Sequence, residues 1–114
     1  MNLIRYEATR YQPEAADGIF TRSLWRNELG NEILSVLLSR NSRLPEHGHP
    51  GWEHIFVVYG SLTVGDQVLG GGDYLFTDVG EIHDVKANED SEILIILQKG
   101  MSIPITDPSN WHAL

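Results

Sequence analysis

The sequence predicts an all-β protein, a sandwich or barrel built from short strands. Short apolar or alternating runs recur along the chain, and Gly, Asn, Asp and Pro interrupt them at close intervals. Helical periodicity is scarce, and the one helix candidate is a short turn from Pro13 to Asp17. Together these observations favour strands joined by tight turns over a helical or mixed fold.

The expected strands lie between these turns. In the first half of the chain, Ile19–Trp25 and Ile33–Leu38 flank a turn at 29–31, and Glu53–Tyr59 follows the turn at Pro50–Gly51. In the second half, each strand is bounded by a turn that contains glycine, asparagine or aspartate. Those strands are Ser61–Val64, Gln67–Leu69, Tyr74–Phe76, His83–Ala87 and Ile93–Gln98.

Two of these strands are apolar on both faces. Every position from Ile93 to Leu97 is apolar, and the strand from Glu53 to Tyr59 is nearly so. On the latter, Ile55, Val57 and Tyr59 share one face, and His54, Phe56 and Val58 share the other. A strand with one face in water should alternate, so a second sheet, the N-terminal segment or another subunit must cover the outer face. We therefore expect a homodimer.

Composition narrows the class of protein. The chain has 114 residues, 41% of them hydrophobic and 21% charged, which predicts one globular domain with a single core. It has no cysteine, so disulfides, thiolate metal sites and cysteine nucleophiles are excluded. A net charge of −8 with scattered basic residues argues against nucleic acid and anionic membranes as partners. Without a signal-peptide pattern or an apolar run of membrane length, we expect a cytoplasmic protein.

A cluster of histidines precedes the strand at 53–59. His47 and His49 are separated only by Gly48, and alternate side chains of an extended segment point the same way. The turn at Pro50–Gly51 then brings Glu53 back toward them. Two imidazoles and a carboxylate are donors that transition metals prefer, so this spacing indicates a metal site.

The remaining histidines and one tryptophan can also be assigned to the site or excluded from it. His83, at a second junction between a turn and a strand, is the best candidate for a fourth ligand. His54 must point away from Glu53, so we exclude it, and His112 in the polar tail is expected to be a surface residue. Trp52, directly before Glu53, is the tryptophan most suited to line a pocket.

At these residues the sequence resembles the cupin superfamily. The first cupin motif, G-x5-H-x-H-x3,4-E-x6-G, here reads His47-x-His49-x3-Glu53-x6-Gly60. The second, G-x5-P-x-G-x2-H-x3-N, here reads Gly72-x5-Asp78-x-Gly80-x2-His83. Three departures affect turns rather than ligands: Asn41 stands for the leading glycine, Asp78 for the proline, and Asn88 comes one residue late.

The resemblance implies a fold and a site. It implies one small cupin domain over residues 1–114, a double-stranded β-helix or jelly roll of the RmlC-like type, with a core barrel at about 19–100 and extensions at both ends. It implies that His47, His49, Glu53 and His83 hold one divalent transition metal ion, such as Fe, Mn, Ni, Co or Zn.

Several functions are compatible with such a site, because a fold does not fix a function. A metal with open positions can bind an enolisable or aromatic compound and activate it toward O2, with Glu53 as a ligand or as the general base, which would make the protein a dioxygenase. The alternatives are a small-molecule sensor without turnover and a non-redox isomerase, lyase or hydrolase. The mostly apolar lining expected from Ile55, Val57, Tyr59 and Val85 favours an apolar or aromatic small molecule.

Overall fold

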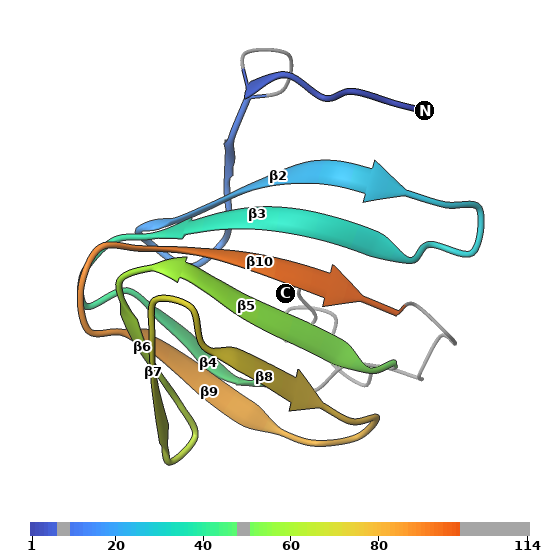
Figure 1. The fold of residues 1–114 in the computed structure, drawn as a ribbon. Helices are drawn as coiled ribbons and strands as arrows, with labels where there is room; N and C mark the ends of the chain where they lie inside the picture. The colour runs from blue at the N-terminus through green and yellow to red at the C-terminus, as the bar shows by residue number, and fades with distance from the viewer. Residues whose placement is uncertain (7–9, 48–50, 99–114) are drawn as a thin grey trace.

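The computed structural model describes residues 1–6, 10–47 and 51–98, with the backbone alone at 45–47. These residues form strands and turns and contain no α-helix (Figure 1). In chain order the strands are β1 (Gln12–Pro13), β2 (Ile19–Arg26), β3 (Glu32–Leu38), β4 (Arg43–His47), β5 (Glu53–Tyr59), β6 (Ser61–Val64), β7 (Gln67–Gly70), β8 (Tyr74–Thr77), β9 (His83–Ala87) and β10 (Ser91–Leu97).

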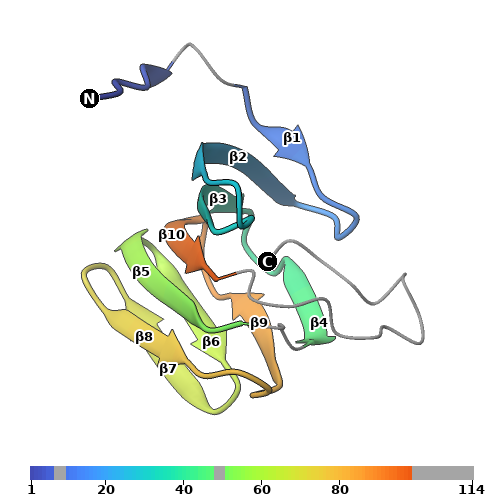
Figure 2. The same cartoon turned by 90° about the vertical axis from the view of Figure 1, so that its right-hand side faces the viewer.

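The strands form two antiparallel sheets that lie face to face (Figures 1 and 2). One sheet has six strands in the order β1-β2-β3-β10-β5-β8, and the other has four in the order β4-β9-β6-β7. Neighbours in the sheets are mostly distant in the chain, which is the strand-crossing arrangement of a jelly roll. The all-β jelly-roll prediction is confirmed.

Alternation places one hydrophobic core between the sheets. Ile55 and Val57 of β5 are at most 1% exposed, whereas Phe56 between them is 43% exposed. The same alternation in β10 buries Ile93 and Ile95. The buried apolar side chains from both sheets form one cluster: Ile19, Leu34, Val36, Leu38, Leu44, Ile55, Val57, Leu62, Val64, Leu69, Val85, Ala87, Ile93, Ile95 and Leu97.

The expected helix at Pro13–Asp17 is wrong. Gln12 and Pro13 pair with Thr21 and Phe20 as the short strand β1, and the chain then turns back into β2. The turn is closed by a 2.9 Å hydrogen bond from the backbone N–H of Glu14 to the carbonyl of Ile19. Pairing with β2 therefore prevailed over a weak local helical pattern.

The sequence pattern also missed strand β4 as an element. Its sequence, RLPEH, contains a proline and three charged or titratable residues, which hides the strand pattern. β4 lies at the edge of the four-stranded sheet and pairs there only with β9, so a proline is tolerated.

One interior position was predicted wrongly. Tyr59 was expected to face inward with Val57, but it is 49% exposed. Glu92 pairs with Tyr59 and Ile93 pairs with Val57, so the register shifts by one residue at this end of β5. Such a bulge breaks the alternation and turns Tyr59 outward.

The outer face of the six-stranded sheet is covered in one part and bare in another. Over β2 and β3, the hydroxyl groups of Tyr11 and Ser35 are hydrogen bonded at 2.6 Å, and the guanidinium of Arg22 lies 4.9 Å from the ring centre of Tyr6. The N-terminal segment therefore packs on this part of the sheet. Over β5, β8 and β10, large apolar side chains remain exposed: Phe56, Val58, Tyr74, Phe76 and Ile96.

The glycine-rich segment at 70–72 connects the two sheets. It links β7 of the four-stranded sheet to β8 of the six-stranded sheet, so it crosses between the sheets and does not close a hairpin. No helix in the described part of the chain has the length and hydropathy needed to cross a bilayer.

Candidate metal centre

Glu53 and His83 meet inside one end of the barrel. Each is the first residue of its strand, Glu53 in β5 of one sheet and His83 in β9 of the other. Glu53 is 1% exposed and His83 is 9% exposed. His83 Nε2 lies 3.5 Å from Glu53 Oε1. The structure therefore brings together two residues that are 30 positions apart in the chain.

Strand alternation fixes the direction of both side chains. Glu53 shares its face with Ile55 and Val57, and His83 shares its face with Val85 and Ala87, all of which are buried in the core. Because these apolar neighbours must be inside, the two polar side chains at the strand ends must also point inward.

A tight turn delivers His83 to its position. The backbone N–H of Glu81 donates to the carbonyl of Asp78 at 3.2 Å, and the N–H of Asp78 donates to the Glu81 carboxylate, also at 3.2 Å. Gly80 in this turn has φ 83°, a value that glycine adopts without steric cost. The replacement of the cupin proline by Asp78 thus leaves a closed turn ahead of β9.

The other two expected ligands are only partly described. The backbone of His47 pairs directly with His83 between β4 and β9, so His47 belongs to the same end of the barrel. Its side chain and the whole of His49 lie outside the described residues. Of the four expected ligands, only Glu53 and His83 have described side chains. Within the described residues, no group of three or more His, Asp or Glu side chains could hold a metal ion.

His54 and Trp52 lie on the outside of the barrel. The Nδ1 atom of His54 is hydrogen bonded to the hydroxyl group of Tyr74. The Trp52 ring packs edge-on against the His54 ring at 4.7 Å between centres, and Phe76 lies 5.0 Å from the same ring. The His54 side chain therefore points outward, away from Glu53, as strand alternation predicts. The Trp52 ring contacts the outward-facing His54, and a pocket lined by Trp52 stays a prediction.

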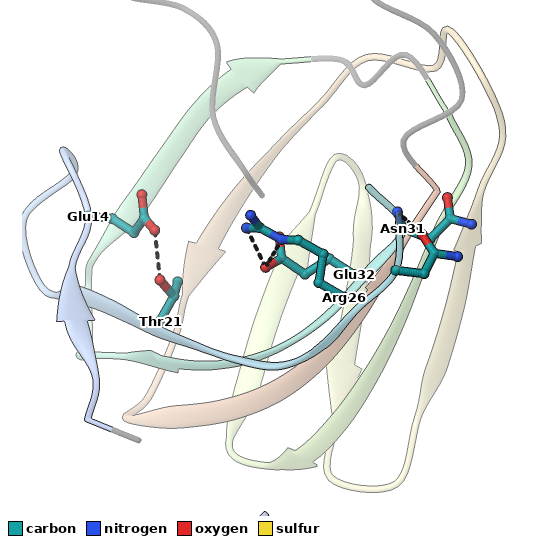
Figure 3. Close-up of polar contacts among 6 residues, drawn as sticks. Glu14, Thr21, Arg26, Asn31 and Glu32 are labelled. Carbon is teal, nitrogen blue, oxygen red and sulfur yellow. Dashed lines mark hydrogen bonds and ion pairs between the residues drawn. The ribbon is translucent and has the colours of Figure 1, made fainter. Parts of the chain in front are cut away.

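An ion pair at the same end of the barrel was not expected from the sequence. Glu32 Oε2 accepts hydrogen bonds from Arg26 Nη2 at 2.8 Å and from Arg26 Nε at 3.2 Å. Figure 3 shows Arg26 and Glu32 on the same side of the sheet as Thr21, whose hydroxyl group donates to Glu14. Glu32 lies on the same face of β3 as buried Leu34 and Val36, two and four residues later. This spacing in the sequence could have indicated that Glu32 is buried.

Solved structures show the same fold. An RmlC-like cupin from Shewanella frigidimarina aligns with a TM-score of 0.79 and 16% identity over 87% of this chain and 91% of its own. Acetylacetone dioxygenase from Acinetobacter johnsonii aligns with a TM-score of 0.74 and 19% identity, covering 86% of this chain and 72% of the enzyme.

A third structure belongs to a protein complex. The anti-sigma ChrR of Rhodobacter sphaeroides, in complex with SigE, aligns with a TM-score of 0.70 and 22% identity over 81% of this chain. This chain spans about half of that one, covering 50% of its length. At these identities the three likenesses show the fold alone.

The family follows from the sequence itself. No curated protein sequence matches the chain significantly. A family profile described as the ChrR cupin-like domain matches residues 1–102, which is most of the 114 residues. The chain therefore belongs to the ChrR cupin-like domain family, within the cupin superfamily.

Proposed function

We propose that this chain binds one divalent transition metal ion through His47, His49, Glu53 and His83 and uses it to hold a small chelating molecule inside the barrel. The observation that carries this proposal is the buried approach of Glu53 to His83 at 3.5 Å. Fe, Mn, Ni, Co and Zn are the candidate ions, because imidazole and carboxylate donors suit all of them.

The spacing of the described donor atoms fits a shared ion. Two ligand atoms at ~2.1 Å from one metal, with an angle of ~90–110° between them, lie roughly 3.0–3.4 Å apart. The 3.5 Å between His83 Nε2 and Glu53 Oε1 is close to this range. The backbone pairing of His47 with His83 supports a third donor at the same end.

The reaction that this site supports best is the oxidation of an enolisable compound by O2. A bound metal would act as a Lewis acid that stabilises the enolate and makes it reactive toward O2. Glu53 has the role of a ligand or of the general base that takes the proton lost on enolisation. Leu97 and Ile55, both buried beside Glu53, keep bulk water from this carboxylate.

A sensing function is the second candidate, and the family match favours it. The profile takes its name from ChrR, and ChrR is an anti-sigma that is seen in complex with SigE. A chain that spans half of ChrR would supply a ligand-sensing part, and a protein partner would provide the output. In that case the metal would fix the ligand, and binding would occur without turnover.

Metal analysis and oxygen uptake separate these functions. We expect untagged protein to carry one equivalent of transition metal by elemental analysis, and Glu53→Gln and His49→Ala to lose it. Oxygen uptake with pentane-2,4-dione as the probe supports a dioxygenase, binding of the dione without product supports the sensor, and turnover without O2 supports an isomerase or lyase. Protein that takes up no metal, even after incubation with excess Mn, Fe, Co, Ni or Zn, overturns the proposal.

We also propose that a second copy of the chain covers the bare part of the outer sheet. The exposed side chains over β5, β8 and β10 are apolar, and β8 forms an edge of this sheet. Light scattering after gel filtration should give about 25.6 kDa, twice the 12.8 kDa of the chain. Phe56→Glu should give the monomer, whereas Val68→Glu, an exposed position in the other sheet, should not. A monomeric wild type at micromolar concentration overturns this proposal.

A further inference from the structure

A row of paired residues crosses the six-stranded sheet at the end that holds Glu53. Cross-strand pairs connect Arg26 to Glu32, Glu32 to Leu97, and Leu97 to Glu53. Glu32, Leu97 and Glu53 are all at least nine-tenths buried, so they face the interior together. Two strand spacings separate the backbones of Glu53 and Glu32, which is about 10 Å.

Glu32 holds Arg26 by one edge of its guanidinium group. Both contacts, from Nε and Nη2, go to the same oxygen, Oε2. The Glu32 side chain is 9% exposed and the Arg26 side chain is 65% exposed. No described residue accepts a hydrogen bond from Nη1 of Arg26. The end formed by Nη1 and Nη2 therefore remains for a second acceptor, and a guanidinium group binds a carboxylate best with two parallel N–H groups.

We propose that Arg26, held in place by Glu32, recognises a carboxylate on the ligand that the metal site binds. This inference rests on the proposed function and narrows it, since the ligand then carries an anionic group several ångströms from its chelating atoms. An acidic chain of net charge −8 attracts anions poorly in general, so a carboxylate needs a local positive group at the barrel end. Arg26 is a binding and specificity residue here and takes no part in bond making.

The competing explanation is that Arg26 only neutralises the buried carboxylate of Glu32. Loss of a partner from a buried ion pair is costly, so a purely structural arginine also matters for folding. The two explanations differ in one observable, which is whether removal of Arg26 affects anionic ligands more than neutral ligands of the same shape.

A matched set of probes measures this difference. Pentane-2,4-dione chelates through two oxygens and has no carboxylate, 4,6-dioxoheptanoate adds a carboxylate on a short tail, and the methyl ester of the latter keeps the tail without the charge. Binding to Ni-loaded protein is measured by calorimetry without O2. We expect the wild type to bind the carboxylate probe about tenfold or more tightly than either neutral probe, as a charge-assisted hydrogen bond would give.

Arg26→Met should reduce this preference to less than about twofold while affinity for pentane-2,4-dione and for Ni stays unchanged. Arg26→Met/Glu32→Gln removes both charges and gives the same result if the single variant does not fold. Arg40→Met is the matched control, because Arg40 is exposed and its backbone N–H binds Asp90 at the other end of the barrel. It should keep the full preference.

The outcomes separate the two proposals. If the wild type binds Ni but binds the three probes equally, or if Arg26→Met weakens all three equally, the role of Arg26 is overturned and the metal site stands. If the wild type takes up no Ni or other transition metal, both the metal-dependent function and the role of Arg26 toward its ligand are overturned.

Discussion

The two ends of the barrel interior differ in the kind of polar group that they bury. The end near Glu53 buries ionisable side chains, Glu53, His83 and Glu32, at 9% exposure or less. At the opposite end the buried side chain of Ser91 is neutral and hydrogen bonded. There Ser91 Oγ accepts from the N–H of Ser61 at 3.0 Å and donates to the carbonyl of Glu89 at 2.9 Å.

This difference suggests different roles for the two ends: the neutral end stabilises the fold, and the ionisable end holds the candidate metal site. Buried neutral groups with full hydrogen bonding rigidify a fold at little cost. Buried ionisable groups are expensive, and proteins keep them mainly where they bind or react. We therefore expect changes at the neutral end to affect stability alone, and changes at the ionisable end to affect ligands more than folding.

The largest expected effect is at the neutral end. Gly60 has φ 96°, and an added Cβ would lie 2.1 Å from Ser91 Oγ and 2.7 Å from the carbonyl oxygen of Asp90. Gly60→Ala should lower the free energy of unfolding by about 3–4 kcal/mol in urea, from backbone strain and overpacking together. Gly65→Ala, with φ 60° and open space around it, is the control and should cost only about 1 kcal/mol.

If the two ends are separate in function, folded Gly60→Ala protein should still bind the same amount of metal per chain. A loss of metal that exceeds the unfolded fraction would contradict the separation.

A smaller effect is expected from metal at the ionisable end. A metal ion at one hundred times its dissociation constant should stabilise the wild type by about 2.7 kcal/mol, seen as a higher melting temperature than in EDTA. Glu53→Gln and His83→Ala should lose this increase, because each removes a proposed donor. His54→Ala, which changes a histidine on the outer face of the same strand β5, should retain it. Equal melting of wild type with metal and with EDTA would contradict the proposed site.

The sequence predicted most of the fold because the signal is local. Alternating apolar residues bounded by glycine turns located strands such as β5 and β9 at their observed bounds. The exceptions, β1 and β4, are defined by pairing with a distant strand rather than by their own residues. Proline and charged residues at sheet edges carry little strand signal.

For the candidate site, the spacing of the histidine cluster selected Glu53, and the position of His83 between a turn and a strand selected His83. Their approach within the barrel follows from alternation. The Arg26–Glu32 pair was missed for a different reason. It depends on the register between β2 and β3, and that register shifts between Ser23 and Trp25. A bulge changes which residues face inward, and sequence periodicity does not show where it occurs.

The smallest expected effect tests how the neutral end is held closed. Ser91 is 1% exposed, and Ser91→Ala would remove the acceptor for the N–H of Ser61 and the donor to the carbonyl of Glu89. Loss of these bonds should lower the free energy of unfolding by about 1–2 kcal/mol in urea. Ser23→Ala, an exposed serine of β2, should change it by less than about 0.5 kcal/mol. Because Ser91 pairs with Leu38 at the end of β10 farthest from Leu97, affinity for metal should be unchanged in Ser91→Ala, and a drop of tenfold or more would show that the two ends are coupled.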